Sequence, residues 1–137
     1  NLINLNEMTQ EFYINKGSVL PVLRMELIND GRFDFLKSDV IGKALQDSTI
    51  TFTMKNVDTD ILKVSNAKCN IVLADETGCE EKYVIEYKWK ERDTKEEGIF
   101  KGQFTINFNG NISENGVSFP EGKLIMPISE DLIIYIK

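Results

Sequence analysis

The chain has 137 residues, a length at which a single domain is usual and about two-thirds of the unfolded surface is buried on folding. It contains 42% hydrophobic and 28% charged residues, proportions typical of a globular protein rather than a disordered one. The formal net charge of −6 disfavours nucleic acid as a partner, and no apolar run approaches the roughly 20 residues that a membrane span requires.

The amino-terminal residues predict an extended arm. We assign residues 1–15 to this arm and residues 16–137 to a single β-sandwich domain, with Gln10–Ile14 as a first strand. The arm lacks the basic stretch of a signal peptide. Four of its apolar side chains lie outside any strand period, and we expect them to contact a partner protein: Leu2, Ile3, Leu5 and Met8. The alternative is that Leu2, Ile3 and Leu5 fold back as an extra strand of their own domain.

The segment after the arm predicts an edge strand followed by an ambiguous stretch. Residues Val19–Asn29 alternate so that Leu23 and Met25 face inward. Pro21 cannot donate a hydrogen bond to a neighbouring strand, so this strand is expected at the edge of a sheet. Residues Phe33–Asp47 have partly helical spacing, which is compatible with one or two turns of helix.

The next strand is the clearest short one in the sequence. Thr49–Lys55 alternates strictly, and its apolar face includes Phe52. Residues Asn56–Asp60 follow as a turn. Asp58 and Asp60 have the one-residue gap of a calcium-binding loop, but the further ligands of such a loop are missing, so the sequence favours a plain turn.

The two cysteines are predicted not to form a disulfide. We expect Ala67–Ala74 and Tyr83–Trp89 to form a hairpin that turns near Gly78. Cys69 then lies beside the far end of the hairpin and Cys79 at its turn, roughly 25 Å apart at about 3.3 Å per residue. A disulfide needs Cα atoms within about 7 Å, so two free thiols are expected, as in a reducing cytoplasm.

The stretch Tyr83–Phe108 contains two aromatic strands, and the charged residues Lys90–Gly98 between them are expected to form a solvated turn. Residues Asn109–Gly116 are Asn- and Gly-rich and predict a loop. Shorter strands follow at Val117–Phe119, Lys123–Ile128 and Leu132–Lys137. The predicted core is centred on four aromatic residues: Phe52, Trp89, Phe100 and Phe104. Short strands at even spacing, with turn signals between them, predict an all-β sandwich.

The composition offers little catalytic chemistry. The chain has no histidine, which removes the commonest general base and the usual nucleophilic triads. Two cysteines without histidine do not make a structural zinc site, and the sequence contains no phosphate-binding glycine loop. The carboxylates lie in charged loops, where a solvated role is expected. We therefore predict no enzymatic activity, no cofactor and no metal. The aromatic residues leave open a carbohydrate-binding or adhesive sandwich as the alternative function.

Several short motifs occur in an order that resembles one family, the immunoglobulin-like module at the start of the upper baseplate proteins of tailed bacteriophages. The resemblance covers about Lys16 to Ile136. The matching segments are Val19-Leu20-Pro21, Thr49–Lys55, Val64-Ser65-Asn66-Ala67, Tyr87–Thr94, Gly98–Phe104 and Ser118-Phe119-Pro120-Glu121-Gly122. One departure is Arg92, which stands where the family usually has glycine before Asp93.

The resemblance implies that the sandwich is antiparallel and of the immunoglobulin-like type. It also implies a structural virion protein that docks on other virion proteins in a symmetric, multi-copy assembly. It implies assembly in the cytoplasm of a bacterial host and no enzymatic activity. In the upper baseplate proteins a shaft and a host-binding tip follow this module, whereas this chain ends at Lys137. We therefore expect a subunit of the tail or baseplate, the neck or the head decoration.

Overall fold

The computed structural model describes residues 9–26, 48–74, 82–109, 113–114, 117–118, 122–127 and 130–137. Within these residues the secondary structure is almost entirely β, with one short 3₁₀ helix, η2 (Glu91–Thr94). The strands are β1 (Thr9–Ile14), β2 (Leu23–Glu26), β3 (Thr49–Asn56), β4 (Leu62–Lys68), β5 (Asn70–Ala74), β6 (Lys82–Tyr87), β7 (Gly98–Phe108), β8 (Ser113–Glu114), β9 (Val117–Ser118), β10 (Gly122–Met126) and β11 (Asp131–Ile136). The prediction of an all-β fold is confirmed for the residues that the structure describes.

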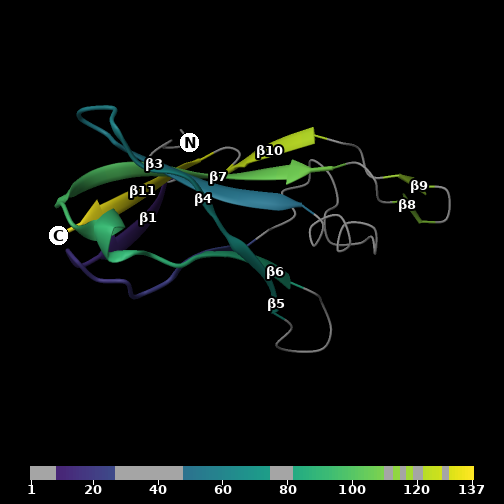
Figure 1. Cartoon of the computed structure of the whole chain (residues 1–137), viewed down its shortest axis with the longest axis horizontal. Coiled ribbons are helices and arrows are strands. Elements are labelled where there is room, and N and C mark those ends of the chain that lie inside the picture. The colour runs from purple at the N-terminus through teal and green to yellow at the C-terminus, as the bar shows by residue number, and fades with distance from the viewer. Residues whose placement is uncertain are drawn as a thin grey trace, which may run out of the picture.

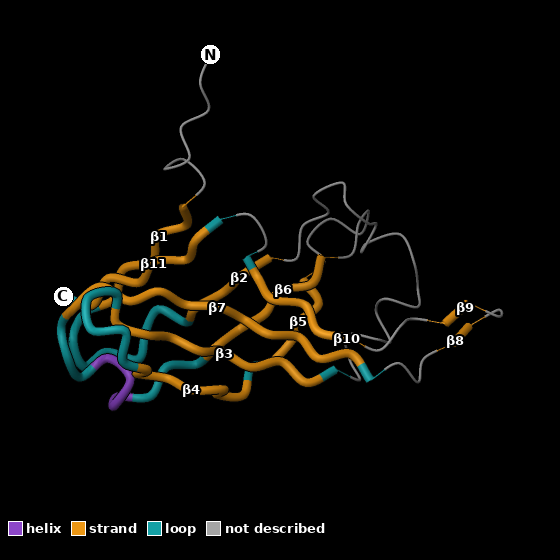
Figure 2. The backbone as a smooth tube through the Cα atoms, turned by 90° about the horizontal axis from the view of Figure 1, so that it is seen from above, coloured by secondary structure: helices purple, strands orange, loops and turns teal. Residues whose placement is uncertain are grey.

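Six strands form the main sheet, in the order β1-β11-β7-β3-β4, with β10 also paired to β7 (Figures 1 and 2). The strand β7 is long enough to pair with β11 along its first half and with β10 along its second half, while β3 pairs with its other side. The strand β1 runs parallel to β11, and the other pairs are antiparallel. The borders of this sheet are therefore β1 and β4, which lie on opposite sides in Figure 2.

A second sheet of three strands, in the order β2-β6-β5, faces the main sheet across one apolar core. All four predicted core aromatics are buried: Phe52, Trp89, Phe100 and Phe104. The ring of Phe52, on β3, lies 4.8 Å from the ring of Tyr87 on β6, measured between centroids, so aromatic contacts join the two sheets. Such pairs stabilise a core beyond the area they bury. Trp89 follows the end of β6 rather than lying within the strand.

The alternation predicted for the individual strands holds closely. Along β7 the residues facing the core alternate with exposed or half-buried ones, and the same is true of β3. Leu23 and Met25 of β2 are buried, and β2 is an edge strand, as the position of Pro21 predicted. The hairpin prediction is confirmed for β5 and β6, which pair antiparallel.

Three predicted segment boundaries need correction. The strand β1 belongs to the main sheet, so residues 9–14 are part of the domain and not of an arm that extends to residue 15. The predicted strand Ala67–Ala74 is interrupted at Cys69, where the chain passes from the main sheet to the second sheet. Residues 113–114 pair with residues 117–118, so the predicted loop 109–116 contains a short strand. The predicted helical turns of Phe33–Asp47, and Cys79 with its predicted free thiol, lie outside the described residues.

The predicted solvated turn Lys90–Gly98 is wrong at two residues, because Asp93 and Thr94 are 4% and 0% exposed. Asp93 accepts hydrogen bonds from the hydroxyl of Tyr87 and, at 2.9 Å, from the backbone N–H of Lys90. The Thr94 hydroxyl donates to the carbonyl oxygen of Ser18 at 2.8 Å. A buried carboxylate is tolerated when it is hydrogen-bonded in this way, and these bonds attach η2 to the body of the domain. Burial, together with the bond to Asp93, raises the pKa of Tyr87 above its ordinary value.

Candidate interaction surface

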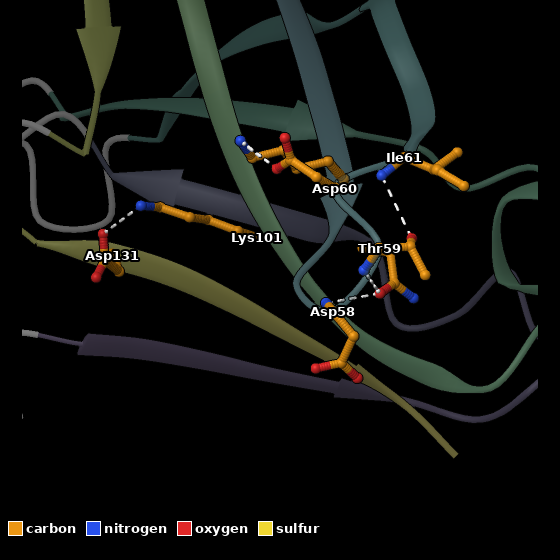
Figure 3. Close-up of polar contacts among 8 residues, drawn as sticks. Asp58, Thr59, Asp60, Ile61, Lys101 and Asp131 are labelled. Carbon is orange, nitrogen blue, oxygen red and sulfur yellow. Dashed lines mark hydrogen bonds and ion pairs between the residues drawn. The ribbon is translucent and has the colours of Figure 1, made fainter.

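The described residues bring no catalytic or metal-binding cluster together. No three cysteine, aspartate or glutamate side chains among them lie close enough to hold a metal ion. The turn after β3 illustrates this (Figure 3): the side-chain oxygen of Asn56 accepts the backbone N–H groups of Asp58 and Thr59, while Asp60 pairs with Lys55 at 2.8 Å. The two aspartates of the turn point in different directions and do not converge on one point. Likewise, no helix in the described part of the chain has the length and hydrophobicity to cross a membrane.

Most of the aromatic residues that might have stacked on a sugar are unavailable. Tyr87, Trp89, Phe100 and Phe104 are all buried between the sheets. The side chain of Tyr83 lies outside the described residues. A carbohydrate site would therefore have to use other aromatic side chains.

A row of apolar side chains does cross the outer, solvent-facing side of the main sheet. Tyr13 of β1 lies opposite Tyr135 of β11, and Tyr135 lies opposite Ile99 of β7. Val57, in the turn after β3, is exposed and lies beside Ile99 in the backbone, since its N–H donates to the carbonyl oxygen of Ile99 at 3.0 Å. Opposite residues of paired strands project to the same face. We call Tyr13, Tyr135, Ile99 and Val57 the outer-face row; Tyr13, Val57 and Ile99 are 51%, 50% and 44% exposed.

The aromatic end of the outer-face row is held by contacts within the domain. The rings of Tyr13 and Tyr135 stack nearly parallel, with centroids 4.7 Å apart and an interplanar angle of 10°. The Lys137 ammonium lies 5.1 Å from the centroid of the Tyr13 ring, and the Tyr13 hydroxyl donates to Glu11 at 3.2 Å. A hollow of about 130 Å³ lies beside Tyr13 and is also lined by the exposed Leu20. These contacts hold the rings of Tyr13 and Tyr135 in one arrangement.

The outer-face row reaches the border strand β1, whose second side has no strand partner among the described residues. An open border strand can accept an extended segment of another chain through its backbone groups. Residues 1–8 precede β1 directly in the sequence. The predicted contact residues Leu2, Ile3, Leu5 and Met8 lie there, outside the described residues, so their contact with a partner stays a prediction.

The sequence contained one signal for the outer-face row that alternation alone did not reveal. In β11 the buried residues Leu132, Ile134 and Ile136 are interleaved with Ile133 and Tyr135, so both faces of this strand are apolar. A strand that covers a core on one side and faces water on the other normally alternates with polar residues. The unbroken apolar sequence of β11 was therefore a signal that its outer face is apolar as well.

Neither a family model, nor a curated protein, nor a solved structure matches this chain. The proposed function therefore rests on the fold, on the surfaces and on the resemblance of the sequence motifs described above.

Proposed function

We propose that this protein is a structural, non-enzymatic subunit of a tailed-bacteriophage virion. In this proposal it is an immunoglobulin-like module that docks on other virion proteins in the tail or baseplate, the neck or the head decoration. It acts in several copies around a symmetric particle, after assembly in the cytoplasm of the bacterial host.

The strand order supports the immunoglobulin-like part of the proposal. A variable-type immunoglobulin sandwich places its strands G, F, C and C′ in one sheet and B, E and D in the other. In chain order, β3, β4, β7 and the β10–β11 pair take the positions of C, C′, F and G in the main sheet, while β2, β5 and β6 take those of B, D and E. Two features depart from antibody domains: Trp89 follows the E-position strand instead of lying on C, and Cys69 lies between β4 and β5.

The observation that carries the docking part is the outer-face row. Its side chains are exposed, apart from the half-buried Tyr135, and they extend across three strands to the turn after β3, next to the open border of β1. Exposed apolar side chains that gather on one face mark interaction sites more often than isolated ones do. Burial of such side chains in a subunit contact stabilises the assembly by roughly 25 cal/mol for each Å² removed from water. A symmetric particle repeats this contact at every copy of the subunit.

A carbohydrate-binding or adhesive module is the second candidate, because Tyr13 and Tyr135 are exposed or half-buried aromatics at the surface. Their stacking on each other, however, already occupies one face of each ring. A glycan array distinguishes the two functions. Retention of a glycan that is lost in Tyr13→Ala would favour the carbohydrate reading over virion assembly.

The proposal is tested by complementation, with a phage that lacks this chain and is supplied with variants in trans. Ile99→Glu places a charge in the outer-face row, and Val72→Glu places one on an exposed residue of the second sheet as a matched control. We expect both purified domains to keep the wild-type melting temperature, because both positions are exposed. Only Ile99→Glu should fail to enter particles. Normal incorporation of Ile99→Glu would reject the docking surface.

A further inference from the structure

A polar pocket of about 400 Å³ lies at the border of the main sheet opposite to β1. It is formed between the border strand β4 and the segment that contains η2. Its lining is formed by residues 63–68 of β4, by Tyr87 at the end of β6, and by Lys90, Arg92 and Asp93 in the segment that follows β6. This volume is within the usual range for a ligand site, although the lining is far more polar than usual.

The pocket is basic in a chain that is acidic overall. Four cationic side chains line it, Lys63, Lys68, Lys90 and Arg92, against a single carboxylate, Asp93. Asp93 is 4% exposed, and its carboxylate accepts hydrogen bonds from Tyr87 and from the Lys90 backbone. It therefore neutralises little of the positive charge at the surface of the pocket.

The cations themselves are largely uncompensated. The Lys63 ammonium approaches an exposed carboxylate, that of Glu96, at 3.7 Å, a contact that contributes little in water. Lys68, Lys90 and Arg92 form no ion pair with any carboxylate in the described part of the chain. Although the chain carries a net charge of −6, these four cations form a local positive field that attracts anions.

The arrangement of the cations indicates what kind of anion fits. Lys63 and Lys68 lie near the two ends of β4, whereas Lys90 and Arg92 come from the segment on the other side of the pocket. A ligand with several carboxylates can neutralise more of these four cations than a single phosphate or carboxylate can. An extended polypeptide carries side chains on one face every two residues, or roughly 7 Å, so it can present several carboxylates along the pocket.

The geometry of β4 limits how an extended segment could bind there. The pairing of β4 with β3 is irregular on either side of Met54, and Asn66 has a positive φ of 50°. Irregularities of this kind prevent a border strand from accepting a long, regular partner strand. Binding along β4 would therefore depend on charge-assisted contacts with the lysine and arginine side chains.

We propose that this pocket binds an acidic, extended segment of a second protein, with carboxylates contacting Lys63, Lys68, Lys90 and Arg92. The inference does not depend on the virion assignment, because it concerns the border of the sheet opposite to the outer-face row. It gives the domain two distinct contact regions, one apolar and one basic. Loss of binding at one contact region can therefore be measured separately from loss of binding at the other.

The test uses a fluorescein-labelled peptide of four Glu-Thr repeats, which places its carboxylates on one face when extended. Fluorescence anisotropy at low salt (about 20 mM) compares the whole chain with Lys68→Glu/Arg92→Glu. The matched control is Lys55→Glu/Lys123→Glu, which changes the net charge equally at lysines that do not line the pocket. Circular dichroism establishes that both variants are folded.

We expect the pocket variant to bind the peptide at least about tenfold more weakly than the wild type, the control variant to bind within about threefold of it, and a Gln-Thr peptide not to bind. Equal losses in both variants would overturn the proposal, because binding would then reflect overall charge alone. Displacement of the peptide by millimolar inorganic phosphate would overturn it in favour of a small-anion site. Tighter binding of a single-stranded oligonucleotide through the same residues would overturn it in favour of nucleic acid. Failure of the peptide to bind at low salt would reject it outright.

Discussion

Replacement of Gly102 by alanine should destabilise the domain, although the same change at most strand glycines is neutral or stabilising. Gly102 lies in the middle of β7, between Phe100 and Phe104 on the face that covers the core. A Cβ added there would lie 2.8 Å from the Cδ1 atom of Ile134 and 2.8 Å from the Cε1 atom of Phe52. Real Cβ atoms essentially never approach neighbours that closely, so the core must shift.

The two neighbours differ in how easily they can move. The terminal methyl group of Ile134 can change rotamer. Phe52 cannot move cheaply, because it is fully buried and its ring lies 4.8 to 5.8 Å, between centroids, from the rings of Tyr87, Trp89 and Phe104. Overpacking of a dense core costs about 1–3 kcal/mol, whereas the lower entropy of the unfolded alanine chain returns about 0.4–1 kcal/mol. The net expectation is a loss of about 1–2 kcal/mol.

Urea unfolding measures this change as a lower midpoint at unchanged slope. The matched control is Gly122→Ala at the start of β10, where an added Cβ meets no atom within 4 Å. The stability of this variant should equal or slightly exceed that of the wild type. Ile134→Val removes one of the clashing atoms, so Gly102→Ala should cost less in that background than in the wild type. A Gly102→Ala variant as stable as the wild type would refute the packing described for β7.

Three further predictions concern other parts of the domain. Asp93→Ala should lower the free energy of unfolding by about 1–3 kcal/mol, because it leaves the Tyr87 hydroxyl and the Lys90 N–H without their acceptor. The control Glu91→Ala, at the exposed start of η2, should change this free energy by less than about 0.5 kcal/mol. Comparable urea midpoints for the two variants would contradict this prediction. Burial raises the pKa of the Cys69 thiol to about 12 from an ordinary value of 9.0. Between these two pH values the folded state retains a proton that the unfolded state releases. The contribution of this thiol to stability is therefore complete below about pH 9 and is lost as the pH rises towards 12. The expected slope is a loss of about 1.4 kcal/mol per pH unit in that window; denaturation at several pH values should show a shallower decline for Cys69→Ala, and an identical decline would remove Cys69 as a source. Removal of residues 1–8, which stops short of β1, should leave the melting temperature nearly unchanged and prevent entry into particles, whereas a large drop in melting temperature would place Leu2, Ile3 and Leu5 in the core of their own domain.

Local alternation was sufficient to predict most of the strands. Thr49–Lys55 and Phe100–Phe108 were predicted with the correct faces, because a period of two is a direct consequence of strand geometry. The core aromatics followed from the same pattern. The pairing of β5 with β6 was also predictable, because the two segments are close in sequence.

The features that sequence reasoning missed depend on contacts between distant segments. Asp93 and Thr94 lie in a run of charged residues, and only the approach of Tyr87 and Ser18 makes their burial favourable. The parallel pairing of β1 with β11 joins opposite ends of the chain, which no local pattern reports. The outer-face row and the basic pocket arise in the same way, since each is assembled from segments whose pairing sets their arrangement.

The central claim, that this protein is a structural part of a tailed-phage particle, is tested most directly on purified particles. Tailed particles from a host that encodes the chain would be separated by density, digested for mass spectrometry, and labelled with a gold-conjugated antibody raised against the purified domain. The claim predicts peptides of the chain at a fixed ratio to the known structural proteins, with gold at one repeated position on the tail, neck or head. Intact particles without these peptides, from a lysate in which the chain is abundant, would contradict it.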